Sequence, residues 1–256
     1  VNDMDPEKMN LTEEDIKNRY ISPAIFETAG WKKKDSLMEY YYTDGQINVV
    51  DDVAKRSNGK KVDYLLLYKP NYPIAVIEAK DRKKHPQPSA GLQQGMGYAR
   101  DLQVPFAYSS NGDAFVEHDM LTGKERTLTL DEFPTKEELW KRYVKEKKIS
   151  DKEIKVINEP YYSSRDTYSP RYYQQNAINR VVEKIANGER RALLVMATGT
   201  GKTYTAFQIV YRLLKAGIKH RVLYLADRNI LVDQARLNDF NPLSDKITKV
   251  QDGHMD

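Results

Sequence analysis

Residues 62–80 read VDYLLLYKPNYPIAVIEAK, and the fold of the N-terminal half follows from them. Two apolar runs, 62–68 and 73–79, flank the four residues KPNY, in which Pro70 and Asn71 are typical of a tight turn. This pattern predicts a β-hairpin. In both runs apolar residues occupy consecutive positions and not only every second one, which indicates that both faces of the hairpin are covered.

Helical patterns lie on either side of this hairpin in the sequence. The stretch 11–30 is predicted to be a helix that Thr12 caps and that Pro23 kinks or splits. A second helix is expected at 89–102, and after it comes the strand-like PFAYSS, which ends at the turn pair Asn111-Gly112. The order helix, two strands, helix, strand predicts an α/β fold with a sheet flanked by helices.

The composition is that of an ordinary globular protein, with 40% hydrophobic and 30% charged residues. Basic residues exceed acidic ones by 41 − 37 = 4, which permits a nucleic-acid partner without requiring one. Because cysteine is absent, disulfides and thiolate metal sites are excluded and a cytoplasmic location is favoured. No apolar run reaches the roughly 20 residues of a membrane helix, and the four histidines lack the spacing of a zinc site.

The pattern changes from residue 168 onward to that of a parallel βαβ unit. The expected elements are helices at 171–187, 203–215 and 230–240 and strands at 192–197 and 221–226. The stretch 135–165 is highly charged and lacks a strong core pattern in its second half, so the domain boundary is placed there. The predicted organisation is a first domain at 1–150, a linker at 151–167 and a truncated second domain at 168–256.

Two carboxylates and a lysine lie on the predicted hairpin. Glu78 and Lys80 are two residues apart and therefore point to one face of their strand. If the turn centres between Pro70 and Asn71, paired residue numbers sum to 141, which sets Asp63 opposite Glu78. Carboxylates that close repel unless a cation lies between them, and Mg²⁺ suits such ligands. Lys80 can then orient or deprotonate a water for attack on a phosphodiester; the alternative is a surface Asp beside a structural Glu–Lys pair.

This arrangement resembles the PD-(D/E)xK nucleases, with Val62-Asp63 in place of Pro-Asp. The resemblance implies a restriction-endonuclease-like sheet and metal-dependent DNA cleavage. Glu13 matches the acidic residue that many members carry near the metal, although it can equally complement the helix dipole. Gln94 and Tyr98 share one helix face and match a Q-x-x-x-Y pattern that lies by the DNA or metal in a subgroup; ordinary helix surface is the alternative.

Residues 193–208 read LLVMATGTGKTYTAFQ and place a glycine-rich turn between an expected strand and helix. Backbone N–H groups of such a turn can wrap phosphates, and the helix N-terminus adds positive potential. Lys202 can reach the β- and γ-phosphates, and Thr203 can ligate Mg²⁺; the alternative is a turn with an incidental lysine. Met196 stands where the general pattern has Gly, and ATGTGKT instead resembles the superfamily 2 helicase variant, which implies ATP. The candidate nucleotide-binding residues are Gln174, Thr198, Gly199, Thr200, Gly201, Lys202 and Thr203.

Two further residues favour a helicase-like motor with a RecA-like parallel α/β fold. Gln174 lies upstream of the loop, at the position where such motors use a glutamine to read adenine. Arg228 in LADRNILVDQA is the candidate contact to the DNA backbone. The alternative role of Gln174 is that of an amide on a helix surface, and the alternative role of Arg228 is a salt bridge at a helix N-terminus. The second acidic motif of such motors is missing downstream, because the Asp131-Glu132 pair lies upstream of the loop. The chain alone is therefore expected to bind nucleotide weakly without efficient turnover, and a DNA-stimulated ATPase activity would contradict this.

Seven segments of the chain occur in the same order in the R (motor) subunit of type I restriction enzymes, which the chain therefore resembles. The segments are LTEEDIKNRYISPAIFETAGW, VDY…VIEAK, GLQQGMGYA, PFAYSSNG, RYYQQNAI, ATGTGKT and LADRNILVDQA. The resemblance implies a subunit that docks on methyltransferase (M) and specificity (S) subunits, pumps double-stranded DNA with ATP and cleaves it with Mg²⁺. The start at Val1 and the missing acidic motif indicate the N-terminal piece of such a subunit.

Two other functions stay open at this stage. A DNA-repair or remodelling ATPase would carry a degenerate, non-cleaving N-terminal domain, against which the intact Asp63, Glu78 and Lys80 argue. The other is an NTPase without a nucleic-acid partner, against which Gln174 and the LADRN segment argue.

Overall fold

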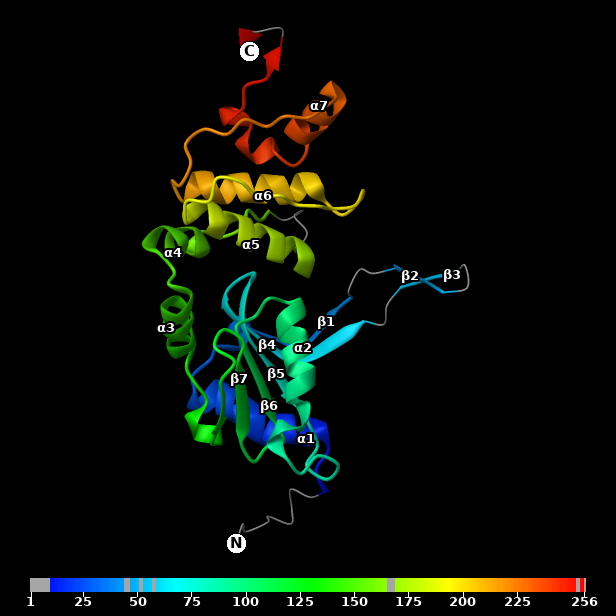
Figure 1. The fold of residues 1–256 in the computed structure, drawn as a ribbon, viewed down its shortest axis with the longest axis vertical. Coiled ribbons are helices and arrows are strands. Elements are labelled where there is room, and N and C mark those ends of the chain that lie inside the picture. The colour runs from blue at the N-terminus through cyan, green and yellow to red at the C-terminus, as the bar shows by residue number, and fades with distance from the viewer. Residues whose placement is uncertain are drawn as a thin grey trace. The chain divides into compact units, whose positions relative to one another are not determined.

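The computed structural model describes residues 10–43, 47–50, 53–56, 59–164, 169–251 and 254–255. The chain divides into two compact units, unit 1 (Val1–Ile149) and unit 2 (Ser150–Asp256), drawn as ribbons in Figure 1. Tyr168, where the second domain is expected to begin, lies outside the described residues. No helix within the described ranges has the length and apolar character needed to cross a bilayer.

Unit 1 is built on a six-stranded mixed sheet. The strand order is β1-β4-β5-β6-β7-β8, and all neighbours are antiparallel except β5 and β6, which are parallel. The strands are β1 (Ser36–Tyr42), β4 (Lys60–Lys69), β5 (Tyr72–Ala79), β6 (Phe106–Ser110), β7 (Phe115–Asp119) and β8 (Glu125–Leu128). Strands β2 (Ile47–Val50) and β3 (Val53–Arg56) form a separate hairpin. The predicted mixed sheet flanked by helices is confirmed.

The β4–β5 hairpin has the predicted turn and register. Asn71 in the turn adopts a left-handed φ of 62°, a conformation that asparagine tolerates. Tyr64 pairs with Ile77 and Leu65 with Val76, so paired residue numbers sum to 141. Every residue of β5 is buried, which accounts for its uninterrupted apolar sequence.

Helical segments precede and follow the hairpin. The first is α1 (Glu13–Ile16), capped by Thr12, and it continues into the π-helical turns η2 (Lys17–Ile21) and η3 (Ala24–Thr28) on either side of Pro23. Since proline has no N–H to donate, wider turns around Pro23 accommodate it. The other helical segments of unit 1 are η4 (Lys33–Asp35), η5 (Pro88–Gly91), α2 (Leu92–Asp101), η6 (Leu130–Glu132) and α3 (Lys136–Lys147).

The helices of unit 1 cover the sheet. Ile16 of α1 lies in the main apolar core with Tyr64 and Ile77, while α2 packs against β5 and β6 (Figure 1). Helix α3 also belongs to unit 1, because the Trp140 ring stacks on Tyr68 with a centroid distance of 3.9 Å.

Unit 2 consists mainly of helices in its described part. Its elements are α4 (Asp151–Asn158), α5 (Tyr172–Ala186), α6 (Lys202–Lys215), α7 (Asn229–Leu237), η7 (Asn241–Lys246) and the short strands β9 (Val250–Gln251) and β10 (His254–Met255). Helix α4 lies inside the stretch 151–167 that the sequence analysis treats as a linker. Ser150 starts this helix with a capping box, and Val156 is buried with Val182 and Leu213, so the structure differs from that expectation.

The two strands expected in unit 2, at 192–197 and 221–226, are not formed in the structure. Both stretches are irregular, and Leu193, Val195 and Leu223 expose 87%, 89% and 74% of their surface. A strand exists only through backbone hydrogen bonds to a neighbouring strand. Among the described residues nothing pairs with these stretches, so their apolar patterns lack the sheet that the prediction assumed.

Candidate functional site

The predicted carboxylate pair is assembled at the β4–β5 hairpin. Asp63 lies in β4 and Glu78 in β5, one step beyond the Tyr64–Ile77 pair in the same register. Each residue exposes only 4% of its surface. Buried carboxylates are rare unless they are paired or coordinate a metal, so their other contacts decide what this pair can do.

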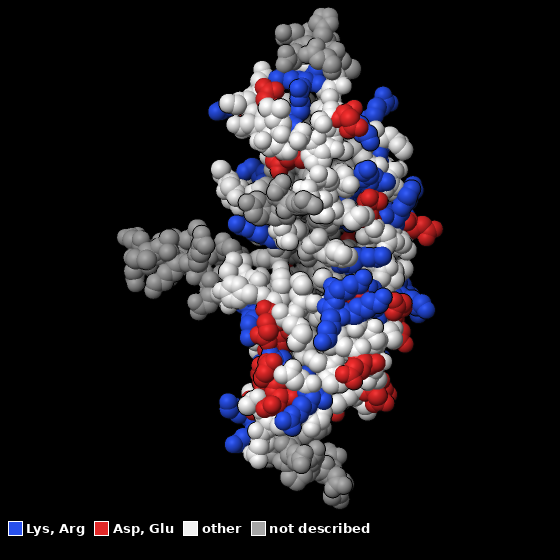
Figure 2. Space-filling model, turned by 180° about the vertical axis from the view of Figure 1, so that it is seen from behind, with Lys and Arg blue, Asp and Glu red and all other residues white. Residues whose placement is uncertain are grey.

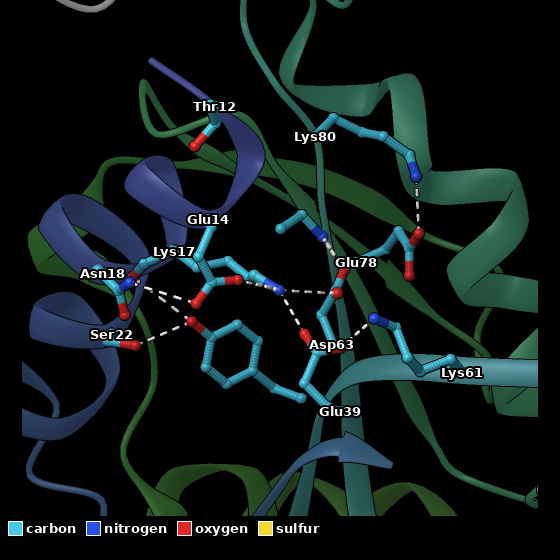
Figure 3. A network of polar contacts seen from close by, with 12 residues as sticks. Thr12, Glu14, Lys17, Asn18, Ser22, Glu39, Lys61, Asp63, Glu78 and Lys80 are labelled. Atoms are coloured by element: carbon cyan, nitrogen blue, oxygen red, sulfur yellow. Dashed lines mark hydrogen bonds and ion pairs between the residues drawn. The ribbon is translucent and has the colours of Figure 1, made fainter. Parts of the chain in front are cut away.

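The oxygens of the two carboxylates differ in their contacts (Figure 3). Asp63 Oδ2 accepts a hydrogen bond from the Ala79 N–H at 2.8 Å, and Asp63 Oδ1 lies 3.4 Å from Lys17 Nζ. Glu78 Oε1 accepts from Lys80 Nζ at 2.7 Å. Glu78 Oε2 is buried and has no hydrogen-bond partner among the described residues. One ligand position of the pair is therefore open.

Two acidic side chains of the site, Glu78 and Glu13, have raised pKa values. Burial, and then the charge of Asp63, raises the pKa of Glu78 from 4.5 to about 7. Burial and the Asp63 charge also raise the pKa of Glu13, which stands in the first turn of α1. A divalent cation would reverse both effects because it favours the charged carboxylates.

A polar chain leads from Glu78 to helix α2. Lys80 Nζ donates to Gln94 Oε1 at 3.1 Å, and Gln94 Nε2 donates to the Tyr98 hydroxyl at 2.6 Å. Burial would lower the pKa of Lys80, but the hydrogen bond to Glu78 and the negative charges of the surrounding carboxylates together outweigh it, and the pKa is raised. The protonated form is therefore favoured, which suits orientation of a water or phosphate rather than proton abstraction.

A glycine lets the start of α2 approach this pair closely. A Cβ built on Gly91 would lie 2.8 Å from Glu78 Cγ and 2.9 Å from Ser109 Oγ, closer than real side-chain contacts. The Gly91 N–H donates to Ser109 Oγ at 3.0 Å. The structure thus brings Asp63, Glu78, Lys80, Gln94 and Tyr98 into one cluster.

The pair suits one hard divalent cation. Mg²⁺ is commonly held by one or two carboxylates, with water and substrate phosphate as its other ligands. Glu78 Oε2, which no group in the described ranges contacts through a hydrogen bond, provides an open ligand atom. Within the described part of the chain, no group of three or more His, Cys, Asp or Glu side chains is placed to hold a metal. Glu13 is therefore a neighbour of the pair and not a third ligand in this geometry.

Two further residues, Lys17 and Glu39, belong to the site although the sequence did not predict them. Lys17, at the start of η2, is 3% exposed and contacts Asp63. Glu39 of β1 also contacts Lys17. The one sequence signal for Lys17 is its spacing of four residues from Glu13, which puts both on one helix face.

The glycine-rich loop of unit 2, which is the candidate phosphate-binding loop, lies beside a cavity. Gly199 and Gly201 have φ values of 78° and 84°, and Gly201 caps α6. Gln174 Nε2 donates to the Thr200 carbonyl oxygen at 2.8 Å. A cavity of about 890 Å³ is lined by Gln174, Gly199, Thr200 and Gly201, with Tyr204 and Phe207 among its other walls.

The other loop residues do not line this cavity. Lys202 is exposed, and its Nζ donates to the Ala197 carbonyl oxygen at 3.2 Å. Thr203 stands in the first turn of α6, and Thr198 is exposed in the loop. Arg228 is exposed at the N-cap of α7.

The fold and these two sites define a class of protein, in which a restriction-endonuclease-like domain precedes a helicase-like region. Family models match both parts: "Type I restriction enzyme R protein N terminus (HSDR_N)" at residues 36–134 and "Type III restriction enzyme, res subunit" at residues 167–255. The boundary between the two units, at Ile149 and Ser150, falls between these two matched ranges.

Known proteins carry the same combination. The chain is 47% identical over 246 residues to the type I restriction enzyme EcoAI endonuclease subunit of Escherichia coli, which covers 94% of this chain and 30% of that subunit. It is 30% identical over 169 residues to the EcoKI endonuclease subunit of Escherichia coli strain K12, covering 59% of this chain and 13% of that subunit. A solved fragment of an HsdR subunit of a type I restriction enzyme from Vibrio vulnificus YJ016 matches with a TM-score of 0.69 and 40% identity, over 80% of this chain and 38% of that one.

The resemblance to the N-terminal part of type I restriction enzyme R subunits is confirmed by these matches. The chain spans less than a third of the length of either curated relative.

Proposed function

We propose that the chain is the N-terminal part of a type I restriction endonuclease motor subunit, with a Mg²⁺-dependent nuclease domain at 1–150. The observation that carries this is the buried Asp63–Glu78 pair, in which Glu78 Oε2 has no hydrogen-bond partner within the described part of the chain while Lys80 holds Oε1. The relatives named above are endonuclease subunits, which supports the same reading.

Asp63 and Glu78 would hold the ion. When bound, Mg²⁺ supplies charge stabilisation to a phosphodiester undergoing attack. Lys80, fixed between Glu78 and Gln94, orients a water or a phosphate oxygen through its ammonium group. Tyr98 fixes the Gln94 amide and so the direction of Lys80. Glu13 adds negative charge beside Asp63.

For the region 168–256 we propose the beginning of an ATP-binding motor lobe, joined to the nuclease domain through 151–167. The cavity beside Gln174 and the Gly199–Gly201 turn supports this. Thr198, Lys202 and Thr203 would contact the phosphates and their Mg²⁺ once Lys202 leaves the loop carbonyls. Arg228 would contact the DNA backbone from the N-terminus of α7.

The proposed partners are double-stranded DNA and the M and S subunits of a restriction complex. On the face shown in Figure 2, basic and acidic side chains both occur, in keeping with a net charge of +4. The test is Mg²⁺-dependent cleavage of plasmid DNA by the complete subunit with its partners. Cleavage that needs ATP, Mg²⁺ and an intact Asp63 supports the proposal, and ATP-driven DNA translocation without cleavage favours the repair or remodelling alternative.

Glu78→Gln is expected to stabilise the metal-free chain at pH 8 by up to about 3 kcal/mol. The folded-state pKa of Glu78 is raised from 4.5 to about 7, so its proton stabilises the fold fully below pH 4.5, and that contribution is lost as the pH rises through 7. Glutamine carries no charge and avoids this loss. Urea unfolding followed by the fluorescence of Trp31 and Trp140 reports unit 1 alone, because the chain has two tryptophans.

The same unfolding at pH 4.5 should show little difference between Glu78→Gln and the wild type. Glu146→Gln, an exposed change of the same kind on α3, is the matched control and should have no effect at either pH. A Glu78→Gln chain that is less stable than the wild type at pH 8 would contradict the raised pKa.

A further inference from the structure

Lys17 is a buried lysine held by carboxylates alone. Its side chain is 4% exposed, and its Nζ lies 2.9 Å from Glu14 Oε2 and 3.4 Å from Asp63 Oδ1 and also contacts Glu39 Oε1. Lysine is almost never fully buried unless it is paired. An ammonium group has three donors, and here three carboxylates from α1, β1 and β4 surround it.

Glu39 is held toward this ammonium by an unusual backbone. Met38 pairs with Tyr64 and Tyr40 with Val62, so the β1–β4 register sets Glu39 opposite Asp63. Glu39 itself has a φ of 53°, a left-handed conformation that residues other than glycine rarely adopt. Outliers of this kind gather at functional sites, where the surrounding structure over-determines them.

Carboxylates from three neighbouring strands therefore stand in one row: Glu39, Asp63 and Glu78. The Lys17 ammonium lies between the first two, as Figure 3 shows. Between Asp63 and Glu78 no protein cation intervenes: Lys80 contacts the Glu78 oxygen, and Glu78 Oε2 stays open among the described residues. One gap in the row is filled by the protein and the other is available.

We propose that the Lys17 ammonium takes the place of a second divalent cation, so that the nuclease site binds a single metal ion, between Asp63 and Glu78. Lys17 is thus a positioning residue: it neutralises Glu39 and Asp63 and fixes the direction of the Asp63 carboxylate without contacting the reacting atoms. The proposal rests on the proposed metal site. Beyond that site, it assigns to Lys17 the control of how many metal ions the nuclease site binds.

Side-chain exposure indicates that a freed position is reachable from water. Glu14 and Glu39 expose 65% and 39% of their side chains, although Asp63 exposes only 5%. Mg²⁺ and Mn²⁺ prefer oxygen ligands, and one or two carboxylates with water as the other ligands are enough for Mg²⁺. Removal of the ammonium leaves Asp63 and Glu39 without the cation between them, although Lys61 still contacts the outer oxygen of Glu39, and a hydrated divalent ion can replace the ammonium.

The test is a Mn²⁺ titration of the 256-residue chain by calorimetry, without nucleotide, with Mn²⁺ electron paramagnetic resonance as the second readout. The wild type is expected to bind one ion at the site, and Lys17→Met two, with spin coupling between them. Lys17→Arg keeps the charge and is expected to bind one. Lys61→Met is the matched control, and one ion is expected for it. Lys61 also contacts Glu39, but its side chain is 56% exposed, and among the described residues it forms no ion pair with Asp63.

The outcomes separate the two proposals. No site-specific Mn²⁺ binding by the wild type would remove the proposed metal site itself. One ion in the wild type and still one in Lys17→Met, whatever its affinity, would overturn the role of Lys17 while leaving the metal site intact. Two ions in the wild type would overturn it as well.

A folding readout covers the case in which Lys17→Met unfolds without metal. Mn²⁺ is then expected to refold it with the concentration dependence of two ions, measured by tryptophan fluorescence. Lys17→Met combined with Glu39→Gln removes one of the freed carboxylates and is expected to return to one ion. A Lys17→Met chain that Mn²⁺ does not refold would overturn the proposal.

Discussion

Asp63→Asn is expected to lower the rate of DNA cleavage by roughly 10³-fold or more, because a metal ion at a phosphodiester contributes several kcal/mol to transition-state stabilisation. Asparagine keeps the size of the side chain and can still accept the hydrogen bond from the Ala79 N–H. It loses the charge that attracts the cation. The measurement is Mg²⁺-dependent cleavage by the complete subunit, assembled with the methyltransferase and specificity subunits proposed as its partners.

DNA-stimulated ATP hydrolysis by the same Asp63→Asn complex should be unchanged, since the proposed nucleotide site lies in unit 2. Glu146→Gln is the control for a general effect of removing an acidic charge, and its cleavage rate should equal that of the wild type. Cleavage by Asp63→Asn within about tenfold of the wild-type rate would show that Asp63 is not a metal ligand.

Arg142→Ala is expected to cost unit 1 about 3–5 kcal/mol of unfolding free energy, the usual effect of breaking a buried ion pair. Arg142 on α3 makes two hydrogen bonds to Glu117, of 2.7 and 3.0 Å, and its guanidinium lies 4.5 Å from the centroid of the Phe106 ring. Glu117 is 1% exposed. Removal of Arg142 leaves this carboxylate underpaired and removes one of the contacts that hold α3 on unit 1.

Arg126 provides a matched comparison, because it bonds the same carboxylate at 2.9 and 3.0 Å but exposes 48% of its side chain. Arg126→Ala is therefore expected to cost only about 1 kcal/mol. Equal losses for the two variants would contradict the role assigned to α3 docking. Urea unfolding followed by tryptophan fluorescence measures both.

The loss in Arg142→Ala should depend on pH in a defined direction. Burial would raise the pKa of Glu117, but the hydrogen bonds from Arg142 and Arg126 outweigh it and lower the pKa from 4.5 to about 2. The stabilisation is therefore present above pH 4.5 and is lost as the pH falls toward 2. The difference between wild type and Arg142→Ala should shrink over that range.

Much of the hairpin could be predicted from sequence because its information is local. The KPNY turn fixes which residues pair, and the pairing rule then places Asp63 against Glu78 with no further knowledge of the fold. The helix that begins after Thr12 was equally accessible, since a capping box is a short-range signal.

Lys17 and Glu39 could not be found in this way. Their meeting depends on how α1 lies on the sheet and on which strand joins β4 at its other edge, both of which are long-range facts. The left-handed φ of Glu39 has no glycine or turn signal in the sequence. In unit 2 the apolar stretches 192–197 and 221–226 predicted strands, but an apolar pattern does not supply the neighbouring strand that a sheet requires.

The most direct test of the account is Mn²⁺ binding by calorimetry, with the wild type beside Asp63→Ala and Glu78→Ala, because it does not depend on cleavage. The account predicts that the wild type binds the ion and that both substitutions abolish binding while unit 1 stays folded, as tryptophan fluorescence would report. No binding by the wild type, or binding indifferent to both substitutions, would contradict it and leave a motor fragment whose N-terminal domain is not a metal-dependent nuclease.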